Sequence, residues 1–547
     1  MQSTMMTDGL TLDLLLERTE RLFPDTAIVS RAPDRSLHRS NYGKMARRAR
    51  ALAGGLQRAG LRPGDRVASL MWNHAAHLEA YFGVPLAGGV LHTLNLRLSP
   101  EDLVYIIQHG GDRFLILDDV LLPLFERIRD QVNLERVWVV AWDDAPAPAA
   151  SLEHYEDLLA GGEEHFVLPA LDERDPCLMC YTSGTTGRPK GVVYSHRSTV
   201  LHALASALPD GVELSCHDTV TPVVPMFHAN AWGLPFAATL VGASQVFPGP
   251  HLDPENLLDL FAGEGVTLTA GVPTIWLGLL EALRREPERW TLPPMRTVVG
   301  GSAVPASLIE GMARFGLAVI QGWGMTETSP LAALGRLKPA EEALPAPQRL
   351  HFQTSQGLPS PLVRMRLADE GGKVLPWDGR QMGEVQVRGP WVTAAYYGGE
   401  GADKFTADGW LRTGDVAVID PRGYVFLTDR TKDLVKSGGE WISSVALENA
   451  LMDHPAVLEA AVIAVPHARW GERPLAVVVF NAGQAATIAE LQAFLEQRFA
   501  KWMVPEQFVF ADAIPRTSTG KFNKLALRAE FAQGSLLAEE FDDPAPA

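Results

Sequence analysis

Cysteine is scarce in this sequence: the chain has three in 547 residues. Three cysteines cannot build the disulfide framework of a secreted domain, so we expect a protein of a reducing compartment, the cytoplasm. Cys177 and Cys180 form a C-x-x-C pair, but the apolar run around them is typical of a buried strand. No second Cys/His pair with zinc-ligand spacing follows, so the pair predicts core packing rather than a metal site.

Long apolar runs and an excess of positive charge are also lacking. The longest candidate membrane segment, 225–246, is interrupted by His228, Asn230 and Pro235, so we expect no transmembrane segment. The first 23 residues lack the basic start of a signal peptide. Lys and Arg total 48 against 65 Asp and Glu, a net charge of −17, which argues against binding to nucleic-acid backbones. A local pocket can still hold an anionic nucleotide.

The composition that is present is that of a globular protein, with 46% hydrophobic and 21% charged residues. The length suffices for about three or four domains. In the first half, strand-like runs (66–71, 113–117 and 137–141) alternate with helical patterns such as 73–86. This alternation predicts parallel sheets covered by helices. Residues 143–176, rich in Ala, Pro, Gly and acids, are typical of a linker with one short helix.

The pattern changes near residue 355. Short strands are predicted at 364–367, 383–387, 416–419 and 424–427, and the sequence D-P-R-G at 420–423 favours a tight turn. Beyond residue 430, the patterns predict helices at 444–452 and 489–499 and strands near 460 and 477. We therefore expect an α/β protein with a large, multi-sheet N-terminal domain and β subdomain (1–428), a hinge (429–433) and a small, mobile α+β C-terminal domain (434–547).

The clearest local motif is Y-T-S-G-T-T-G-R-P-K-G at 181–191, between two predicted strands. Its glycines allow the backbone to approach a ligand closely. Four hydroxyl side chains and Lys190 add donors and a positive charge, a combination that suits a polyphosphate. The motif is not a Walker A loop, because Pro189 precedes the lysine and Gly191 follows it.

This loop resembles the signature of the adenylate-forming enzymes, which include acyl-CoA synthetases, luciferases and peptide-synthetase adenylation domains. Four further motifs follow in the family's order, so the resemblance covers nearly the whole chain. They are Q-G-W-G-M-T-E at 321–327, T-G-D at 413–415, D-R-T-K-D at 429–433 with K-S-G-G-E-W at 436–441, and P-R-T-S-T-G-K at 515–521. Within the family, 224–232 and 438–444 are most similar to long-chain fatty-acyl-CoA synthetases.

The resemblance implies roles for individual residues. Glu327 and Thr182 would hold Mg²⁺, Lys521 would be the main catalytic cation, and Asp429 would be the hinge pivot. The nucleotide would be bound by residues of the loop and of the later motifs: Ser183, Gly184, Thr185, Thr186, Gly187, Lys190, Gly301, Gln321, Gly322, Thr326, Asp415, Arg430, Lys432, Lys436 and Trp441. His228 and Trp232 would border the acyl pocket, with Trp232 able to gate it; His196 is expected to be structural.

The implied function is an ATP-dependent fatty acid:CoA ligase that forms an acyl-AMP and then an acyl-CoA, with coenzyme A as co-substrate. Three alternatives stay open: a ligase for short, medium-chain or functionalised acids, an acyl-AMP ligase that loads a carrier protein, and a nucleotide-binding regulator without catalysis. Luciferase-type oxidation is a remote fourth. A homodimer is expected by analogy with the dimeric long-chain enzymes.

Overall fold

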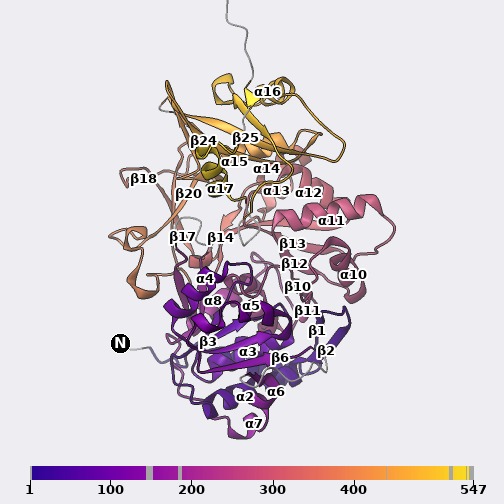
Figure 1. Cartoon of the computed structure of the whole chain (residues 1–547), viewed down its shortest axis with the longest axis vertical. Helices are drawn as coiled ribbons and strands as arrows, with labels where there is room; N and C mark the ends of the chain where they lie inside the picture. Colours follow the sequence, from indigo (N-terminus) through magenta and orange to yellow (C-terminus); the bar gives the residue numbers. More distant parts are fainter. Residues whose placement is uncertain are drawn as a thin grey trace, which may run out of the picture.

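The computed structural model describes residues 3–142, 152–182, 188–438, 440–516 and 522–536, and the backbone of 539–540. Its strands form sheets of nine, seven, six and five strands, with helices packed over them (Figure 1). The predicted α/β class is confirmed. The helices are α1 (Leu12–Leu22), α2 (Tyr42–Arg58), α3 (Ala75–Leu86), α4 (Pro100–Gly110), α5 (Leu122–Glu126), α6 (Tyr155–Leu159), α7 (Gly162–His165), α8 (His196–Ala207), α9 (Leu234–Val241), α10 (Pro254–Glu264), α11 (Pro273–Arg285), α12 (Ala306–Ala313), α13 (Pro339–Glu342), α14 (Ala346–Gln353), α15 (Ser444–Met452), α16 (Ile488–Glu496) and α17 (Lys524–Ala532).

The two largest sheets are mostly parallel, as the alternating pattern predicts. The seven-stranded sheet has the order β7 (Glu153–His154), β6 (Arg136–Val140), β5 (Asp112–Asp118), β3 (Arg66–Leu70), β4 (Val90–Thr93), β8 (Pro176–Tyr181) and β9 (Gly191–Ser195). The nine-stranded sheet has the order β16 (Leu358–Pro359), β15 (Leu331–Leu334), β14 (Leu317–Gly324), β13 (Met295–Val299), β12 (Leu268–Gly271), β10 (Thr219–Pro222), β11 (Ser244–Phe247), β1 (Ala27–Arg31) and β2 (Leu37–Asn41). Only strands near the edges, such as β9 and β15, run antiparallel. A large apolar core that includes residues of both sheets fills the space beneath them.

The predicted β subdomain is an antiparallel five-stranded sheet. Its order is β18 (Val374–Leu375), β17 (Arg364–Ala368), β19 (Gly383–Arg388), β20 (Leu411–Ile419) and β21 (Val425–Arg430). The tight turn between β20 and β21 forms as expected: the Gly423 N–H donates to the Asp420 carbonyl at 2.9 Å, and Gly423 has a φ of 95°. The side chain of Asp420 also accepts from Arg422 N–H at 2.9 Å.

The C-terminal region lies at the top of Figure 1 and contains the six-stranded sheet with α15, α16 and α17. Its strands are β22 (Val435–Ser437), β23 (Glu440–Ile442), β24 (Val457–His467), β25 (Gly471–Phe480), β26 (Gln507–Phe510) and β27 (Glu539–Glu540). The expected hinge, 429–433, begins in the last two residues of β21, which belongs to the sheet below. The domain boundaries at 428 and 434 stay a prediction.

The prediction of a linker at 143–176 is wrong for its described part, from residue 152 onward. That part contains β7, α6 and α7, and it packs on α2. Contact is possible because α2 carries two adjacent glycines: a Cβ on Gly54 would lie 1.9 Å from the Gly162 carbonyl oxygen, and one on Gly55 would lie 2.1 Å from the Leu158 oxygen. Glycines therefore let two helical segments meet backbone to backbone here.

The cysteines occupy two kinds of environment. Cys177 and Cys180 are buried on β8, where burial raises the pKa of their thiols to about 12 and about 11. Cys216 is exposed.

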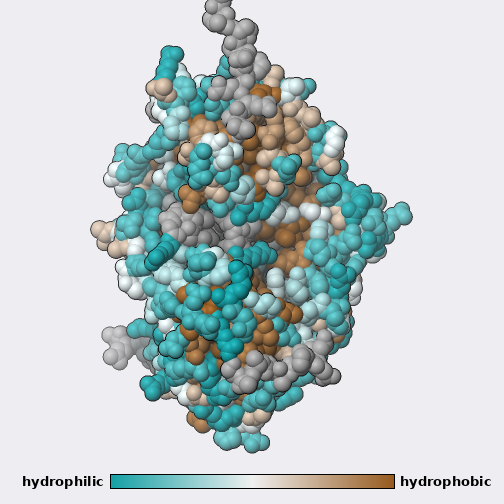
Figure 2. All heavy atoms as spheres, viewed as in Figure 1, coloured by the Kyte–Doolittle hydropathy of each residue, from teal (hydrophilic) through white to brown (hydrophobic). Residues whose placement is uncertain are grey.

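The face shown in Figure 2 is mostly hydrophilic, with apolar atoms gathered along its middle. No helix in the described ranges has both the length and the apolar character needed to cross a membrane.

Candidate active site

A cavity of about 740 Å³ opens where the nine-, seven- and five-stranded sheets meet. Residues that directly follow β8, β10, β12 and β13, and residues at the end of β14, line it. These strands all end at the cavity with their carboxyl ends, the usual place for a ligand site in parallel α/β sheets. Residues from β20, from the end of β21 and from 396–404 close the other side.

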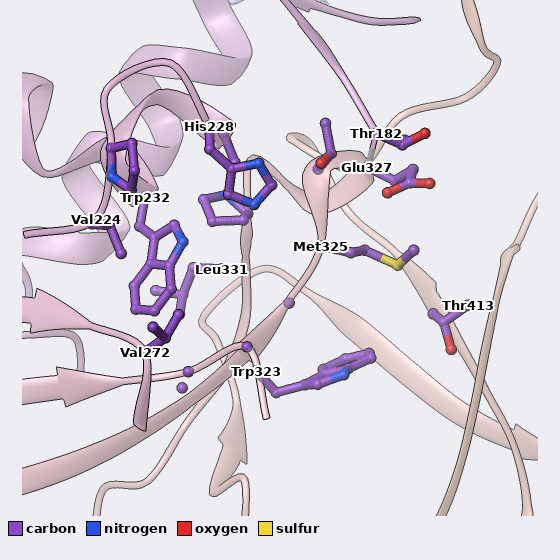
Figure 3. A pocket seen from close by; sticks show the side chains of 18 of the residues that line it. Thr182, Val224, His228, Trp232, Val272, Trp323, Met325, Glu327, Leu331 and Thr413 are labelled. Carbon is purple, nitrogen blue, oxygen red and sulfur yellow. The ribbon is translucent and has the colours of Figure 1, made fainter. Parts of the chain in front are cut away.

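The structure brings most of the described, predicted site residues to this one cavity. They come from five segments that lie far apart in the sequence. Those that line the cavity are Thr182, Lys190, His228, Trp232, Gly301, Gly322, Thr326, Glu327, Arg430 and Lys432. In Figure 3, Thr182 and Glu327 lie at one end and Trp232 at the other.

Five predicted residues do not line the cavity. The Gln321 side chain is buried; its amide donates to the Thr354 carbonyl and its oxygen accepts from Val304 N–H, both at 3.0 Å. Asp415 and Asp429 are buried, and their contacts are described below. Lys436 pairs with Glu370 at 3.2 Å and lies 4.8 Å from the centroid of the Trp441 ring, on the outside. Ser183, Gly184, Thr185, Thr186, Gly187 and Lys521 lie outside the described residues.

Glu327 is a nearly buried carboxylate whose position is fixed from several sides. It lies in a short 3₁₀ turn, Thr326–Thr328, after β14. Its Oε1 accepts a hydrogen bond from the Tyr396 hydroxyl at 2.5 Å, and its carbonyl accepts from Thr393 N–H at 2.8 Å. Burial raises the pKa of the Glu327 carboxyl, and the Tyr396 hydrogen bond acts in the opposite direction. Among the described residues, Tyr396 is the one side chain that hydrogen-bonds this carboxylate.

Thr182 and Lys190 close the base of the predicted phosphate loop. The Thr182 N–H donates to the Lys190 carbonyl at 2.9 Å, and the Lys190 N–H donates to Thr182 Oγ1 at 3.0 Å. Lys190 Nζ lies 5.3 Å from the centroid of the Tyr396 ring. No carboxylate of the described part lies within ion-pair distance of Lys190. The ammonium is therefore held by an aromatic face and has its hydrogen-bond donors available to a ligand.

Asp415 is held by two partners from different sheets. Trp323, at the end of β14, donates its Nε1–H to Asp415 Oδ2 at 2.9 Å. Arg430 lies opposite Asp415 in the β20–β21 pair, with its Nε 3.1 Å from Asp415 Oδ1. The nearby Asp415 charge raises the pKa of Arg430. Trp323 and Arg430 both line the cavity, so Asp415 fixes two of its walls from behind.

The apolar end of the cavity is built around an unusual turn. Residues 229–232 all have positive φ values, from 43° to 56°, and Gly233 follows at 74°. A left-handed conformation costs roughly 1–2 kcal/mol for each residue with a Cβ, so this turn stores strain. The turn directs Trp232 toward Val224, Val272 and Leu331 (Figure 3). Gly300 makes room for the indole: a Cβ there would lie 3.1 Å from Trp232 Cη2.

Asp429, the expected pivot, takes part in a buried polar cluster. Its Oδ2 accepts from both the N–H and the hydroxyl of Ser444 at 2.6 Å. Lys524 on α17 donates to Ser444 Oγ at 2.6 Å and pairs with Glu448 on α15, also at 2.6 Å. One turn further along α17, Arg528 pairs with Asp433. The cluster therefore joins the end of β21 to two helices of the C-terminal region.

Sequence reasoning missed Tyr396, Lys524 and the role of Trp323. Tyr396 belongs to none of the quoted motifs, and its partner Glu327 is 69 positions away. Lys524 reads as one surface lysine among several, yet its side chain is only 11% exposed. His196, expected to be structural, is buried and accepts a hydrogen bond from Leu12 N–H at 3.3 Å. The motif order carries no information on these contacts.

The fold is α/β, and the described part of the chain encloses a cavity that is polar at one end and apolar at the other. Comparison with known proteins extends this. The family model "AMP-binding enzyme" matches residues 16–397, and "AMP-binding enzyme C-terminal domain" matches 446–521. The chain therefore belongs to the AMP-binding enzyme family.

Individual relatives cover nearly the whole chain. The chain is 54% identical over 97% of both proteins to a long-chain-fatty-acid–CoA ligase from Thermus thermophilus. It is 41% identical to a medium-chain-fatty-acid–CoA ligase from Ectopseudomonas oleovorans, over 97% of this chain and 98% of that one. Among solved structures, the anthranilate CoA ligase AuaEII in complex with anthranoyl-AMP superposes with a TM-score of 0.86 at 26% identity, covering 98% of this chain and 100% of that chain.

Proposed function

We propose that this enzyme is an ATP-dependent fatty acid:CoA ligase. In the first half-reaction, the carboxylate of the acid attacks the α-phosphate of ATP, which gives acyl-AMP and pyrophosphate. In the second, the thiolate of coenzyme A attacks the acyl carbon and AMP leaves. The observation that carries the proposal is the cavity itself, which joins Thr182, Lys190 and Glu327 at a polar end to an apolar end around Trp232. The identity to long- and medium-chain fatty-acid ligases supports the same substrate class.

The polar end would orient the nucleotide. Lys190 would pair with phosphate oxygens, and Thr326, whose carbonyl is fixed by the Tyr194 hydroxyl at 2.8 Å, would present its side chain to the α-phosphate. Gly301, Gly322 and Trp323 would border the base, while Arg430, held by Asp415, would contact ribose or phosphate. Lys521 would hold the acid's carboxylate against the α-phosphate and offset the negative charge that grows there.

The donor set at this end fits Mg²⁺. A carboxylate (Glu327) and a hydroxyl (Thr182) line the same end of the cavity, and both are hard oxygen donors. Mg²⁺ usually takes one or two protein ligands and completes its shell with phosphates and water, so these two side chains suffice for the protein's share. The ion would supply neutralisation of the polyphosphate charge.

The second half-reaction needs different neighbours at the same acyl group. We propose that the C-terminal region turns about Asp429, which would bring Lys436 and Trp441 toward the adenylate. In the orientation described here, the cavity lining extends no further along the described chain than Lys432. A homodimer in the cytoplasm is proposed on the resemblance and the low cysteine count alone, and light scattering after gel filtration tests the oligomer.

The test of function is a panel of saturated acids from two to eighteen carbons. CoA-dependent AMP release and CoA-independent pyrophosphate release are measured side by side. Activity that peaks at twelve carbons or more supports a long-chain ligase, whereas a peak at short acids keeps the mechanism and corrects the substrate. Pyrophosphate release without CoA-dependent turnover contradicts the CoA ligase and indicates transfer to a carrier protein. Silence in both channels contradicts catalysis on simple acids.

A further inference from the structure

Tyr396 contacts two of the charged groups at the polar end, Glu327 and Lys190. Its hydroxyl donates to Glu327 Oε1 at 2.5 Å, and its ring lies 5.3 Å from Lys190 Nζ. The side chain is 6% exposed. Lys190 directly precedes β9 and Glu327 lies in the turn after β14; these strands belong to different sheets, and the two residues lie 137 positions apart by their numbers, so Tyr396 bridges two otherwise separate parts of the site.

The segment that carries Tyr396 is itself fastened to the Glu327 turn. Thr393 N–H donates to the Glu327 carbonyl at 2.8 Å, Ser329 Oγ donates to the Trp391 carbonyl at 2.7 Å, and Trp391 Nε1–H donates to the Leu331 carbonyl at 3.0 Å. Gly401 packs directly on the tyrosine ring: a Cβ there would lie 2.9 Å from Tyr396 Cδ2. The phenol is therefore held before any ligand arrives.

We propose that Tyr396 is a positioning residue for nucleotide binding, through two separable contacts. Its hydroxyl fixes the Glu327 carboxylate in one rotamer, with the other oxygen directed to the metal–triphosphate. Its ring holds the Lys190 ammonium by a cation–π contact that leaves the N–H donors for phosphate. This inference rests on the proposed function, because it takes the ligand of this end to be a nucleoside triphosphate with a divalent cation.

The two contacts can be separated by substitution. Tyr396→Phe keeps the ring and removes the hydroxyl, whereas Tyr396→Leu removes both. Binding of a non-hydrolysable ATP analogue is measured by calorimetry, with and without Mg²⁺. We expect Tyr396→Phe to weaken binding about tenfold in Mg²⁺, as for a lost hydrogen bond to a charged group, and to leave binding without Mg²⁺ unchanged. Tyr396→Leu is expected to weaken binding in both conditions.

A control and a double variant complete the experiment. Tyr397→Phe alters the neighbouring, half-buried tyrosine, whose ring contacts His109 at 5.6 Å, and should bind like the wild type. Tyr396→Phe combined with Glu327→Ala should bind no more weakly in Mg²⁺ than Glu327→Ala alone, because Glu327→Ala already removes the oxygen that accepts the Tyr396 hydroxyl, whereas a glutamine would keep an acceptor there. Additive losses, or a Tyr396→Phe variant with wild-type affinity in Mg²⁺, would overturn the proposal. Wild-type binding that does not depend on Mg²⁺ would instead count against the proposed metal–nucleotide site.

Discussion

Aromatic side chains with a polar tip hold the polar end of the cavity. The Tyr396 hydroxyl binds the Glu327 carboxylate, the Trp323 indole N–H binds Asp415, and the Tyr194 hydroxyl binds the Thr326 carbonyl. Each of these rings is buried, with its donor used inside the protein. Aromatic groups of this kind combine packing area with one directed hydrogen bond, so they place charged neighbours accurately.

Trp323→Phe tests this principle at Asp415. The substitution keeps an aromatic wall for the base but removes one of the two partners of a buried carboxylate. A buried acceptor that loses a donor costs about 1–3 kcal/mol, so the KM for ATP should rise several-fold. The measurement is AMP release at varied ATP with saturating acid and CoA. Trp470→Phe, at a tryptophan that is 41% exposed in the C-terminal region, is the control. An unchanged KM in Trp323→Phe would contradict the expectation.

Much of the candidate site could be predicted from the sequence at this scale, because its residues sit in motifs with a fixed order. Thr182, Thr326 and Glu327 reach one cavity as expected, although their chemical roles stay predictions. Contacts between motifs could not be predicted. Whether Gln321 faces a ligand or, as here, the Thr354 carbonyl depends on the packing of a helix end that the motif does not encode.

At the scale of elements, close contacts between backbones decide where helices can pack. α2 meets the α6–α7 segment through Gly54 and Gly55. Gly54→Ala should destabilise the protein by about 1–3 kcal/mol, the usual cost of overpacking, because its Cβ has no room. Gly263→Ala in α10 is the matched helical control: apart from the neighbouring backbone of its own helix, no atom lies within 4 Å of that Cβ. It should stabilise by up to about 1 kcal/mol. Thermal unfolding of both variants measures the difference, and equal shifts would contradict the argument.

The cluster at Asp429 gives a second prediction for this scale. Burial raises the pKa of Glu448 to about 7 even though Lys524 lies beside it, so the cost of taking this carboxylate out of water exceeds the attraction that Lys524 returns. Removing one partner of the pair is strongly destabilising, because it leaves buried carboxylates without the ammonium that balances their charge. Lys524→Met should therefore cost about 3–5 kcal/mol.

Thermal unfolding of the Lys524→Met variant is compared with Arg498→Met, which removes an exposed pair with Asp453 in the same region. That control should cost no more than about 1 kcal/mol. A Lys524→Met variant as stable as the control would show that water or rearrangement replaces the ammonium.

Elements with a strong periodic pattern could be predicted closely. The strands expected at 113–117 and 383–387 appear as β5 and β19, and the helix expected at 444–452 appears as α15 with the same bounds. The structure of the segment 153–165 could not be predicted, because its Gly- and acid-rich composition resembles that of a linker. Its helices are stabilised by tertiary contact with α2. The left-handed turn at 229–232 also has no sequence signal, since three of its four residues do not favour positive φ.

At the scale of the whole molecule, buried neutral histidines link folding to pH. His77 on α3 is fully buried; it donates to the Trp72 carbonyl and accepts from the Ser69 hydroxyl, both at 3.0 Å. Burial lowers the pKa of His77 to about 3. The unfolded chain, with an ordinary histidine pKa of about 6.5, therefore binds one more proton between pH 6.5 and 3. The stability that His77 contributes is complete above pH 6.5 and is lost as the pH falls.

His77→Gln should remove the proton uptake of this histidine on unfolding, and with it the His77 contribution to the pH dependence of the free energy of unfolding. The slope of unfolding free energy against pH, between pH 5.5 and 4.5, should fall by about 1.3 kcal/mol per unit, because the unfolded histidine is almost fully protonated there and the folded one is not, whatever the absolute stability of the variant. Unfolding by urea at several pH values gives the slope. His217→Gln, at an exposed histidine, should leave it unchanged. A His77→Gln variant with the wild-type slope would contradict the burial argument.

The sheltered Cys177 and Cys180 leave Cys216 as the one thiol that a reagent in water can reach. Thiolates, not thiols, react with maleimides, and burial with raised pKa values keeps the other two inert at neutral pH. The native sequence thus already provides a single attachment point for a fluorescent dye on the large N-terminal part. One cysteine added to the C-terminal region would allow a donor and an acceptor dye to be attached for energy-transfer measurements. Changes in the distance between the two parts of the chain during turnover could then be followed in single molecules without deleting any natural cysteine.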